Sequence, residues 1–168
     1  MDFQKIVEKY SSRIYYVVRR IVRDHDDADD VLQNTFMKAW QARDSFRGEA
    51  GVYTWLYRIA VNEALAFLRN SSKMQYASGE EAERELRNLY DNDPYFDGDK
   101  AQKALAMAVD TLPAKQKAVF TLRYFEELSY AQISEVMETS QGALKASYHH
   151  AQKKVEEQLN LFIENISN

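Results

Sequence analysis

Apolar residues recur every three or four positions along most of this 168-residue chain, and only five glycines and two prolines interrupt it. This spacing places apolar side chains along one face of a helix. A sandwich or barrel needs Gly or Pro at many strand junctions, so their scarcity argues against an all-β fold. The sequence therefore predicts an all-α protein.

The apolar pattern divides into two groups with a different segment between them. Residues 71–100 lose the helical spacing, contain turn-forming Ser, Gly, Asn and Pro, and carry 4 Lys or Arg against 8 Asp or Glu. A short helix is possible around residues 80–90. We therefore expect two small helical domains, residues 1–70 and 101–168, joined by a flexible acidic linker over residues 71–100.

The C-terminal group has the spacing of a helix-turn-helix. Ser129 and Gln132 form the pattern of a capping box before a short helix, and Ser140 can cap the last helix. In such a motif the second helix enters the major groove. Periodicity alone leaves DNA binding and an ordinary solvated face as equal alternatives. The polar residues that lie largely off the apolar stripe of the last helix are Gln141, Lys145, Ser147, His149, His150, Gln152 and Lys153.

Aromatic and arginine side chains crowd the loop and helix that end the N-terminal group. Aromatic rings interleaved with Arg form a platform on which single-stranded bases stack. The alternative is that some of these rings fill a small core, as Trp40 would. The residues concerned are Trp40, Phe46, Arg47, Tyr53, Trp55, Tyr57 and Arg58.

The acidic run Asp24–Asp30 suits a helix N-terminus better than a metal site, because the chain lacks both a Glu-x-x-His pair and the Gly of a calcium loop there. We expect it to contact a basic partner and expect no metal. The chain has no Cys, begins without the pattern of a secretory signal, and contains no apolar stretch long enough for a membrane span. A net charge of -4 taken alone argues against binding nucleic acid.

Three segments of the N-terminal group form a recognisable pattern: residues 28–40 (ADDVLQNTFMKAW), 45–48 (SFRG) and 53–62 (YTWLYRIAVN). They resemble the N-terminal domain of extracytoplasmic-function sigma factors, the promoter-recognition subunits of bacterial RNA polymerase. Leu112-Pro113 and the segment 122–151 resemble their C-terminal domain. The resemblance implies a protein with no catalytic residue, cofactor or small-molecule substrate. It also implies a cytoplasmic location.

The resemblance also implies roles for individual residues. The partners implied are core RNA polymerase, promoter DNA and an anti-sigma factor, and the alternative is a stand-alone helix-turn-helix regulator. The polymerase clamp would be bound by Asp29, Asp30, Gln33, Asn34 and Lys38. A pocket for a flipped minus-10 base would be lined by Phe46 and Asn62, with Arg47, Tyr53, Trp55 and Arg58 in the same minus-10 region. The minus-35 element would be read by Arg123, Ser140, Gln141, Lys145, Ala146, Ser147, His149, His150 and Lys153.

The sequence departs from the family pattern at a few positions. Glu138 replaces the usual Gly of the helix-turn, where a left-handed backbone favours glycine. Ser147, His150 and Gln152 stand where Arg is frequent. Fewer fixed positive charges predict fewer phosphate contacts and a weaker dependence on salt.

Overall fold

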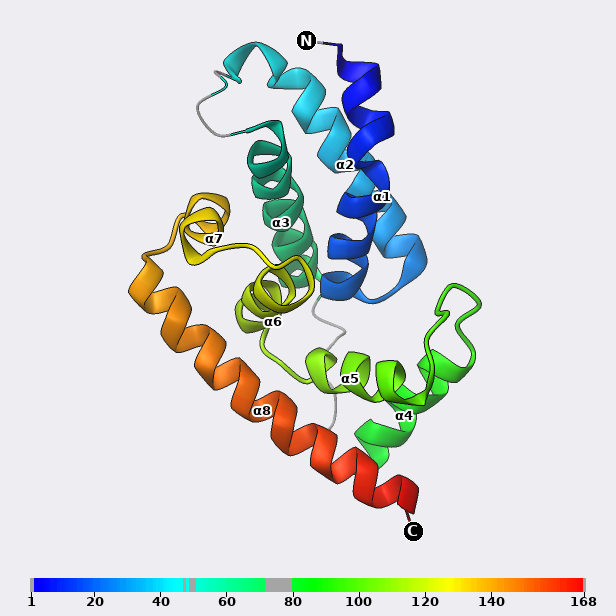
Figure 1. Cartoon of the computed structure of the whole chain (residues 1–168). Helices are drawn as coiled ribbons and strands as arrows, with labels where there is room; N and C mark the ends of the chain where they lie inside the picture. The colour runs from blue at the N-terminus through cyan, green and yellow to red at the C-terminus, as the bar shows by residue number, and fades with distance from the viewer. Residues whose placement is uncertain (1, 47, 49–50, 72–79, 168) are drawn as a thin grey trace.

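The computed structural model of the chain describes residues 2–46, 48, 51–71 and 80–167, and this part of the chain contains helices and no strand. The prediction of an all-α fold is confirmed. None of the described helices is both long enough and apolar enough to cross a membrane. The two termini lie at opposite ends of the molecule (Figure 1).

The N-terminal half is a three-helix bundle in which each helix packs on the other two. Asp2 and Asp24 cap the first two helices by accepting hydrogen bonds from backbone N–H groups one turn on. The third helix begins after Gly51 and buries Leu56, Tyr57 and Ala60. The elements are α1 (Phe3–Val22), α2 (His25–Gln41), the 3-10 turn η1 (Arg43–Ser45) and α3 (Val52–Asn70).

The C-terminal half contains the predicted helix-turn-helix and a second group of helices behind it. The capping box of Ser129 and Gln132 forms as expected, and Asp99 and Gln102 form a second one that the sequence reading did not single out. Residues 121–125 form a single π-helical turn. The elements are α4 (Glu80–Asp91), α5 (Lys100–Asp110), α6 (Ala114–Phe120), η3 (Thr121–Phe125), α7 (Tyr130–Met137) and α8 (Gln141–Ser167).

Part of the predicted linker is folded. The helix expected near residues 80–90 forms as α4, and its Leu86 and Tyr90 are buried in a core shared with α5, α6 and α8. Leu89 is half exposed because it lies off the face of α4 that buries Leu86 and Tyr90. Whether residues 71–100 act as a linker stays a prediction, and residues 72–79 lie outside the described part.

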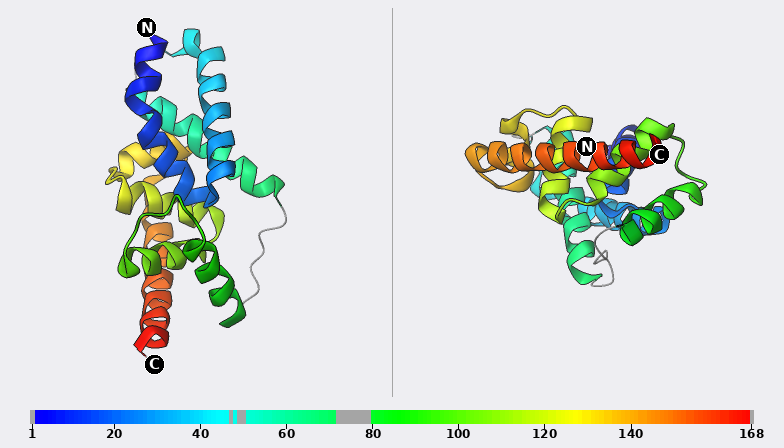
Figure 2. Two further views of the ribbon diagram at one scale, coloured as in Figure 1. Left: turned by 90° about the vertical axis from the view of Figure 1, so that its right-hand side faces the viewer. Right: turned by 90° about the horizontal axis from the view of Figure 1, so that it is seen from below.

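The two halves pack against each other. One apolar core runs from the N-terminal bundle, with Ile14 and Leu56, into α6 and the helix-turn-helix, with Leu122, Ile133 and Leu144. Helix α7 packs against α3, while the long α8 extends away from this contact (Figures 1 and 2). This packing brings the two groups of predicted DNA-binding residues onto one compact body.

Candidate nucleic-acid interface

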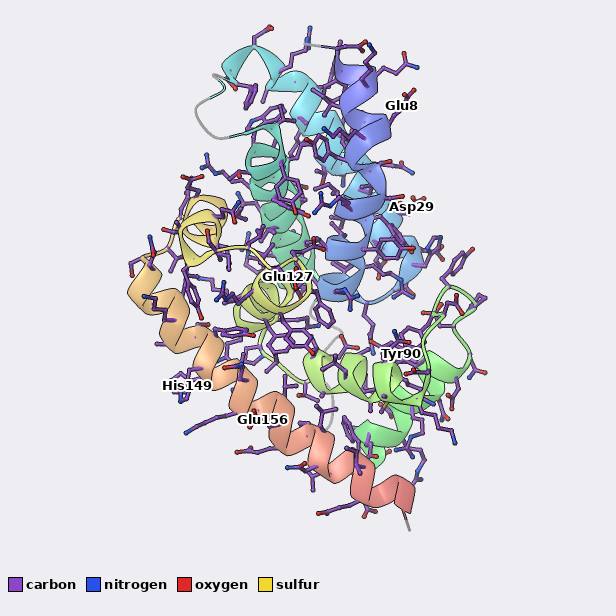
Figure 3. The ribbon with its side chains drawn as sticks, viewed as in Figure 1. Glu8, Asp29, Tyr90, Glu127, His149 and Glu156 are labelled. Carbon is purple, nitrogen blue, oxygen red and sulfur yellow. The ribbon has the colours of Figure 1, made fainter. Side chains whose placement is uncertain are left out.

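The residues predicted to bind polymerase form an exposed stripe on α2. Their spacing of three and four residues places them on one side of the helix, opposite the buried Val31 and Thr35. Figure 3 shows Asp29 projecting from this face. The structure thus leaves the whole set accessible: Asp29, Asp30, Gln33, Asn34 and Lys38.

The acidic start of α2 carries an electrostatic cost. Burial, with the neighbouring Asp24, Asp30 and Asp26 adding to it, raises the pKa of Asp27 above its ordinary value. The five carboxylates within these two turns repel one another, and a cationic partner would relieve that repulsion. In the described part of the chain no three His, Asp or Glu side chains converge as ligands of a metal would.

The predicted minus-10 residues of α3 divide between its two sides. Trp55, Arg58 and Asn62 follow one another at steps of three and four, so they share one face. The ring of Phe46, at the end of η1, lies 5.0 Å from the ring of Trp55. Asn62 is exposed, and Phe46 and Trp55 are half-buried. An aromatic pair and an exposed amide on one face can stack on a base and form hydrogen bonds with its edge.

Tyr53 lies on the other side of α3, against α1. Its ring contacts the rings of Tyr10 and Tyr57, and its hydroxyl accepts a hydrogen bond from Arg13 at 3.1 Å. Partial burial raises the pKa of the Tyr53 phenol. These contacts give Tyr53 a structural place in the bundle. Arg47, also predicted for this region, lies outside the described residues.

An ion pair links the predicted polymerase stripe to the predicted base pocket. Lys38 of α2 pairs with Glu63 of α3, the residue that follows Asn62. Trp40, two residues beyond Lys38, is 48% exposed, so the alternative that it fills the core is wrong. Its ring instead lies on the surface, between Phe3 and the guanidinium of Arg43.

The start of α8 presents polar side chains to solvent. The Ser140 hydroxyl accepts a hydrogen bond from the backbone N–H of Ala143 at 3.3 Å, which confirms the expected cap. Leu144, Ala151 and Val155 are buried, and His149 projects outward (Figure 3). Ser147 is half-buried. The exposed residues among those predicted to read DNA are Ser140, Gln141, Lys145, Ala146, His149, His150 and Lys153.

Arg123 and Glu138 hold the helix-turn-helix together. Arg123 donates a hydrogen bond to the Leu128 carbonyl at 2.9 Å and lies over the Tyr130 ring, so it stabilises the entry to α7. Glu138 adopts the left-handed backbone that the turn requires, at φ 52. The turn is therefore preserved without glycine, at the conformational cost of a non-glycine residue in that region.

Contacts between the two halves were not foreseen from the sequence. The Arg58 guanidinium donates a hydrogen bond to the backbone carbonyl of Glu135 on α7 at 2.9 Å. The Tyr57 hydroxyl donates one to Glu126 at 2.9 Å. No local signal could have indicated these pairs, because their members are 77 and 69 residues apart. A predicted minus-10 residue is thus engaged by the helix-turn-helix.

Comparison with known proteins identifies the family. Residues 6–74 match the family model of sigma-70 region 2, and residues 102–155 match that of sigma-70 region 4. The RNA polymerase sigma-H factor of Pseudomonas aeruginosa is 30% identical over 94% of this chain and 86% of its own length. The chain belongs to the extracytoplasmic-function sigma factors. A sigma-E factor of this group from Haemophilus influenzae is also 30% identical, over 87% of its length.

Solved sigma factor structures share the fold of this sigma factor. RpoE of Bartonella quintana, in complex with the anti-sigma factor NepR, superposes with a TM-score of 0.71 over 95% of this chain and 97% of that one, at 22% identity. CnrH, in complex with the cytosolic domain of CnrY, gives 0.68 over 95% of this chain and 88% of that one. The sigma factor family directs promoter-specific transcription by RNA polymerase and is not a family of enzymes.

Proposed function

We propose that this sigma factor uses three separate surfaces to start transcription. The exposed acidic face of α2 docks on core polymerase. The Phe46, Trp55 and Asn62 side of α3 captures a minus-10 base, and the start of α8 reads the minus-35 duplex. The observation that supports this best is that the sets on α2 and at the start of α8 are largely exposed, while Phe46 lies against Trp55 on the side of α3 that carries the exposed Asn62.

The energetics of promoter opening require a partner. Melting a duplex costs about 1.4 kcal/mol per base-pair step. Stacking a base on an aromatic side chain recovers about 1–3 kcal/mol. A few stacked bases therefore cannot offset the separation of several pairs, and the remaining free energy must come from contacts made by core polymerase. The chain is a specificity subunit that adds no catalytic group of its own.

The accessible minus-35 surface is modestly charged, because Lys145 and Lys153 are its fixed cations. Each neutralised phosphate contributes to affinity through release of counterions. Two contacts of this kind give weak binding to duplex DNA at physiological salt. This supports a subunit that holds promoters only as part of the polymerase.

The same function sets the location and the regulatory partner. Polymerase and chromosome share the bacterial cytoplasm, so the sigma factor acts there. RpoE of Bartonella quintana is held by the anti-sigma factor NepR, and we extend that kind of partner to this chain. The fold similarity and the accessible acidic face of α2 support such an assignment.

Run-off transcription tests the proposal. Core polymerase from the source bacterium is combined with the purified chain and with genomic promoter fragments, and transcripts are mapped at their 5′ ends. We expect transcripts that begin at defined positions and require the chain. Nanomolar binding of duplex sites by the chain alone, without chain-dependent transcripts, would instead identify a stand-alone regulator.

A further inference from the structure

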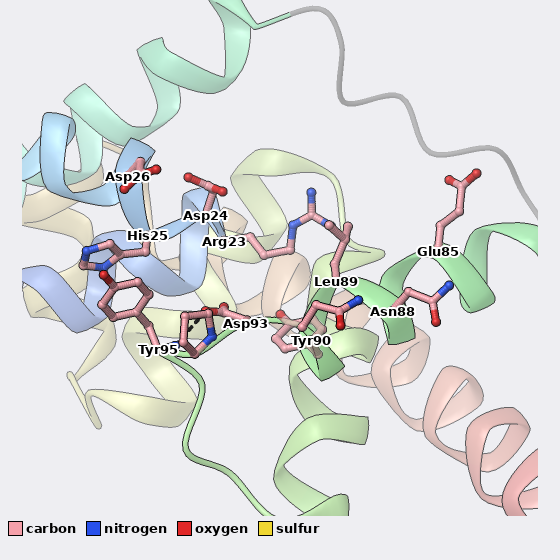
Figure 4. Close-up of a pocket in the computed structure, with 12 residues that line it drawn as sticks. Arg23, Asp24, His25, Asp26, Glu85, Asn88, Leu89, Tyr90, Asp93 and Tyr95 are labelled. Atoms are coloured by element: carbon pink, nitrogen blue, oxygen red, sulfur yellow. Dashed lines mark hydrogen bonds between the residues drawn. The ribbon is translucent and has the colours of Figure 1, made fainter.

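Residues 93–95, which follow α4, tie the C-terminal half to the N-terminal bundle. The Asp93 carboxylate pairs with Arg19 of α1, and both side chains are largely buried, at 16% and 11% exposure. The Tyr95 ring stacks on His25 at the start of α2, with ring centroids 3.5 Å apart and planes within 9°. We refer to these two contacts, Arg19 with Asp93 and His25 with Tyr95, as the clasp. Figure 4 shows His25, Asp93 and Tyr95.

The neighbours of His25 hold its ring in place for this stack. The Tyr15 hydroxyl lies 2.6 Å from His25 Nδ1, and the Tyr15 ring contacts the imidazole from the side. The Tyr95 backbone N–H donates a hydrogen bond to Asp93 at 2.9 Å, which fixes the turn that carries both clasp residues. A hollow of about 610 Å³ lies beside the clasp, between the α1–α2 corner and α4. Water therefore reaches one side of these contacts.

A buried lysine makes a second connection below the clasp. Lys117 of α6 is 5% exposed and donates a hydrogen bond to the Ile21 carbonyl, in the last turn of α1, at 3.1 Å. Its charge is balanced by Asp110, 3.4 Å away, which also accepts a hydrogen bond from Tyr90. A cation suits the carbonyl end of a helix. Buried ion pairs nevertheless add little net stability, because removing both charges from water is costly.

The closed arrangement obstructs the proposed minus-10 surface. Arg58, which shares a face with Trp55 and Asn62, is bonded to Glu135 of α7. Promoter elements about 25 base pairs apart lie roughly 85 Å apart at about 3.4 Å per pair. Helix α8, the longest element at 27 residues, extends only on the order of 40 Å. A chain with α7 packed on α3 cannot occupy both elements, so promoter binding requires the halves to separate.

We propose that the clasp is an autoinhibitory contact: Asp93 and Tyr95 hold the free sigma factor closed, and core polymerase binds the open form. The biological meaning of this inference rests on the proposed function. Breaking the clasp shifts the population toward the open form, and the apparent affinity for core polymerase rises in proportion.

A charge swap tests the clasp. Arg19→Glu and Asp93→Arg each replace the ion pair with a like-charge contact, whereas the double variant restores it in reverse. Asp97→Arg is the matched control, because Asp97 is exposed in the same segment and makes no ion pair with another of the described residues. Small-angle scattering gives the radius of gyration, hydrogen exchange gives the protection of α7, and a fluorescence titration gives the Kd for core polymerase.

We expect each single reversal to increase the radius of gyration by several ångströms from the roughly 15 Å of a compact chain of this length. We also expect α7 to exchange about tenfold faster and core polymerase to bind about tenfold more tightly. The double variant and Asp97→Arg should match the wild type. Should a single reversal lose its helical circular dichroism, the neutral Arg19→Gln and Asp93→Asn replace it in the same measurements.

Unchanged scattering and exchange in the single variants would overturn the clasp. An opened variant whose Kd for core polymerase is unchanged would overturn its inhibitory role. Failure of the double variant to close again would show that Arg19 and Asp93 act through other partners. Scattering and exchange need neither polymerase nor promoter, so these outcomes are distinguishable from a failure of the proposed function in run-off transcription.

Discussion

Removing one oxygen atom at the contact between the two halves should measurably destabilise the protein. Tyr57 is fully buried on α3, and its hydroxyl donates a hydrogen bond to the carboxylate of Glu126 at 2.9 Å. Burial, with Tyr53 and Glu126 adding to it, raises the pKa of Tyr57 far above its ordinary value. The phenol therefore remains a donor at every pH at which the protein is folded. Tyr57→Phe keeps the ring and deletes only this donor.

The magnitude follows from the charge of the acceptor. A hydrogen bond to a charged group contributes about 1.5–3 kcal/mol. Glu126 is partly exposed, so water can replace part of the lost interaction, and the lower end applies. We expect Tyr57→Phe to lower the free energy of unfolding by about 1.5 kcal/mol. For a chain of this length that is a fall in Tm of roughly 3–6 °C.

A double-mutant cycle isolates the interaction across the two halves. Urea unfolding followed by circular dichroism is compared for the wild type, Tyr57→Phe, Glu126→Ala and the double variant. We expect a coupling free energy of about 1 kcal/mol, because the two residues contact each other directly. Additive effects, with coupling below about 0.3 kcal/mol, would refute the reasoning, since they would mean that the halves do not meet at this contact in solution.

Four further outcomes follow from the site. Asn62→Ala should reduce permanganate-detected promoter melting at least several-fold with unchanged core binding, whereas Asn70→Ala, exposed at the end of the same helix, should change neither. Lys145→Ala should lower the salt slope of holoenzyme binding to minus-35 DNA by about 1. Glu138→Gly should raise the free energy of unfolding by up to about 1 kcal/mol in urea titrations, because glycine relieves the left-handed backbone. Asp27→Asn should stabilise the chain by about 0.3 kcal/mol at pH 7. The raised pKa of Asp27 means that its ionised carboxylate destabilises the folded state. In thermal unfolding, the advantage of asparagine over aspartate should therefore vanish as pH falls below about 4 and the carboxyl becomes protonated.

The features foreseen from the sequence are those set by local physics. Helical spacing predicted the bundle, and Ser129 and Ser140 cap α7 and α8 as expected because a hydroxyl needs only the next turn of backbone. Glu138 shows that a turn can keep its left-handed backbone even where the residue is not glycine. The accessible face of α2 follows from the same periodicity that buries Val31 and Thr35.

The contacts between the halves could not be foreseen, because they join residues that are distant in sequence. Lys117 and Ile21 are 96 residues apart, and neither position carries a signal of the other. Arg123 donates a hydrogen bond to the Leu128 carbonyl, a contact that its expected role at DNA did not indicate. Periodicity also cannot tell a buried ring from one held on the surface, which is why Trp40 was misplaced. Tertiary packing decides each of these cases.

The net charge of -4 seemed at first to argue against nucleic acid. Much of the acidity lies on the accessible face of α2 and on α4, away from the start of α8. Acidity therefore limits what the chain can bind alone and does not exclude promoter DNA. Its consequence is that affinity for DNA should depend on core polymerase.

Footprinting on one cognate promoter, with and without core polymerase, tests this dependence most directly. We expect no protection by the chain alone at physiological salt, and protection of both the minus-35 and minus-10 regions once core polymerase is added. Core polymerase without the chain should give no defined footprint. Strong protection of a duplex site by the chain alone, unchanged by core polymerase, would contradict the account.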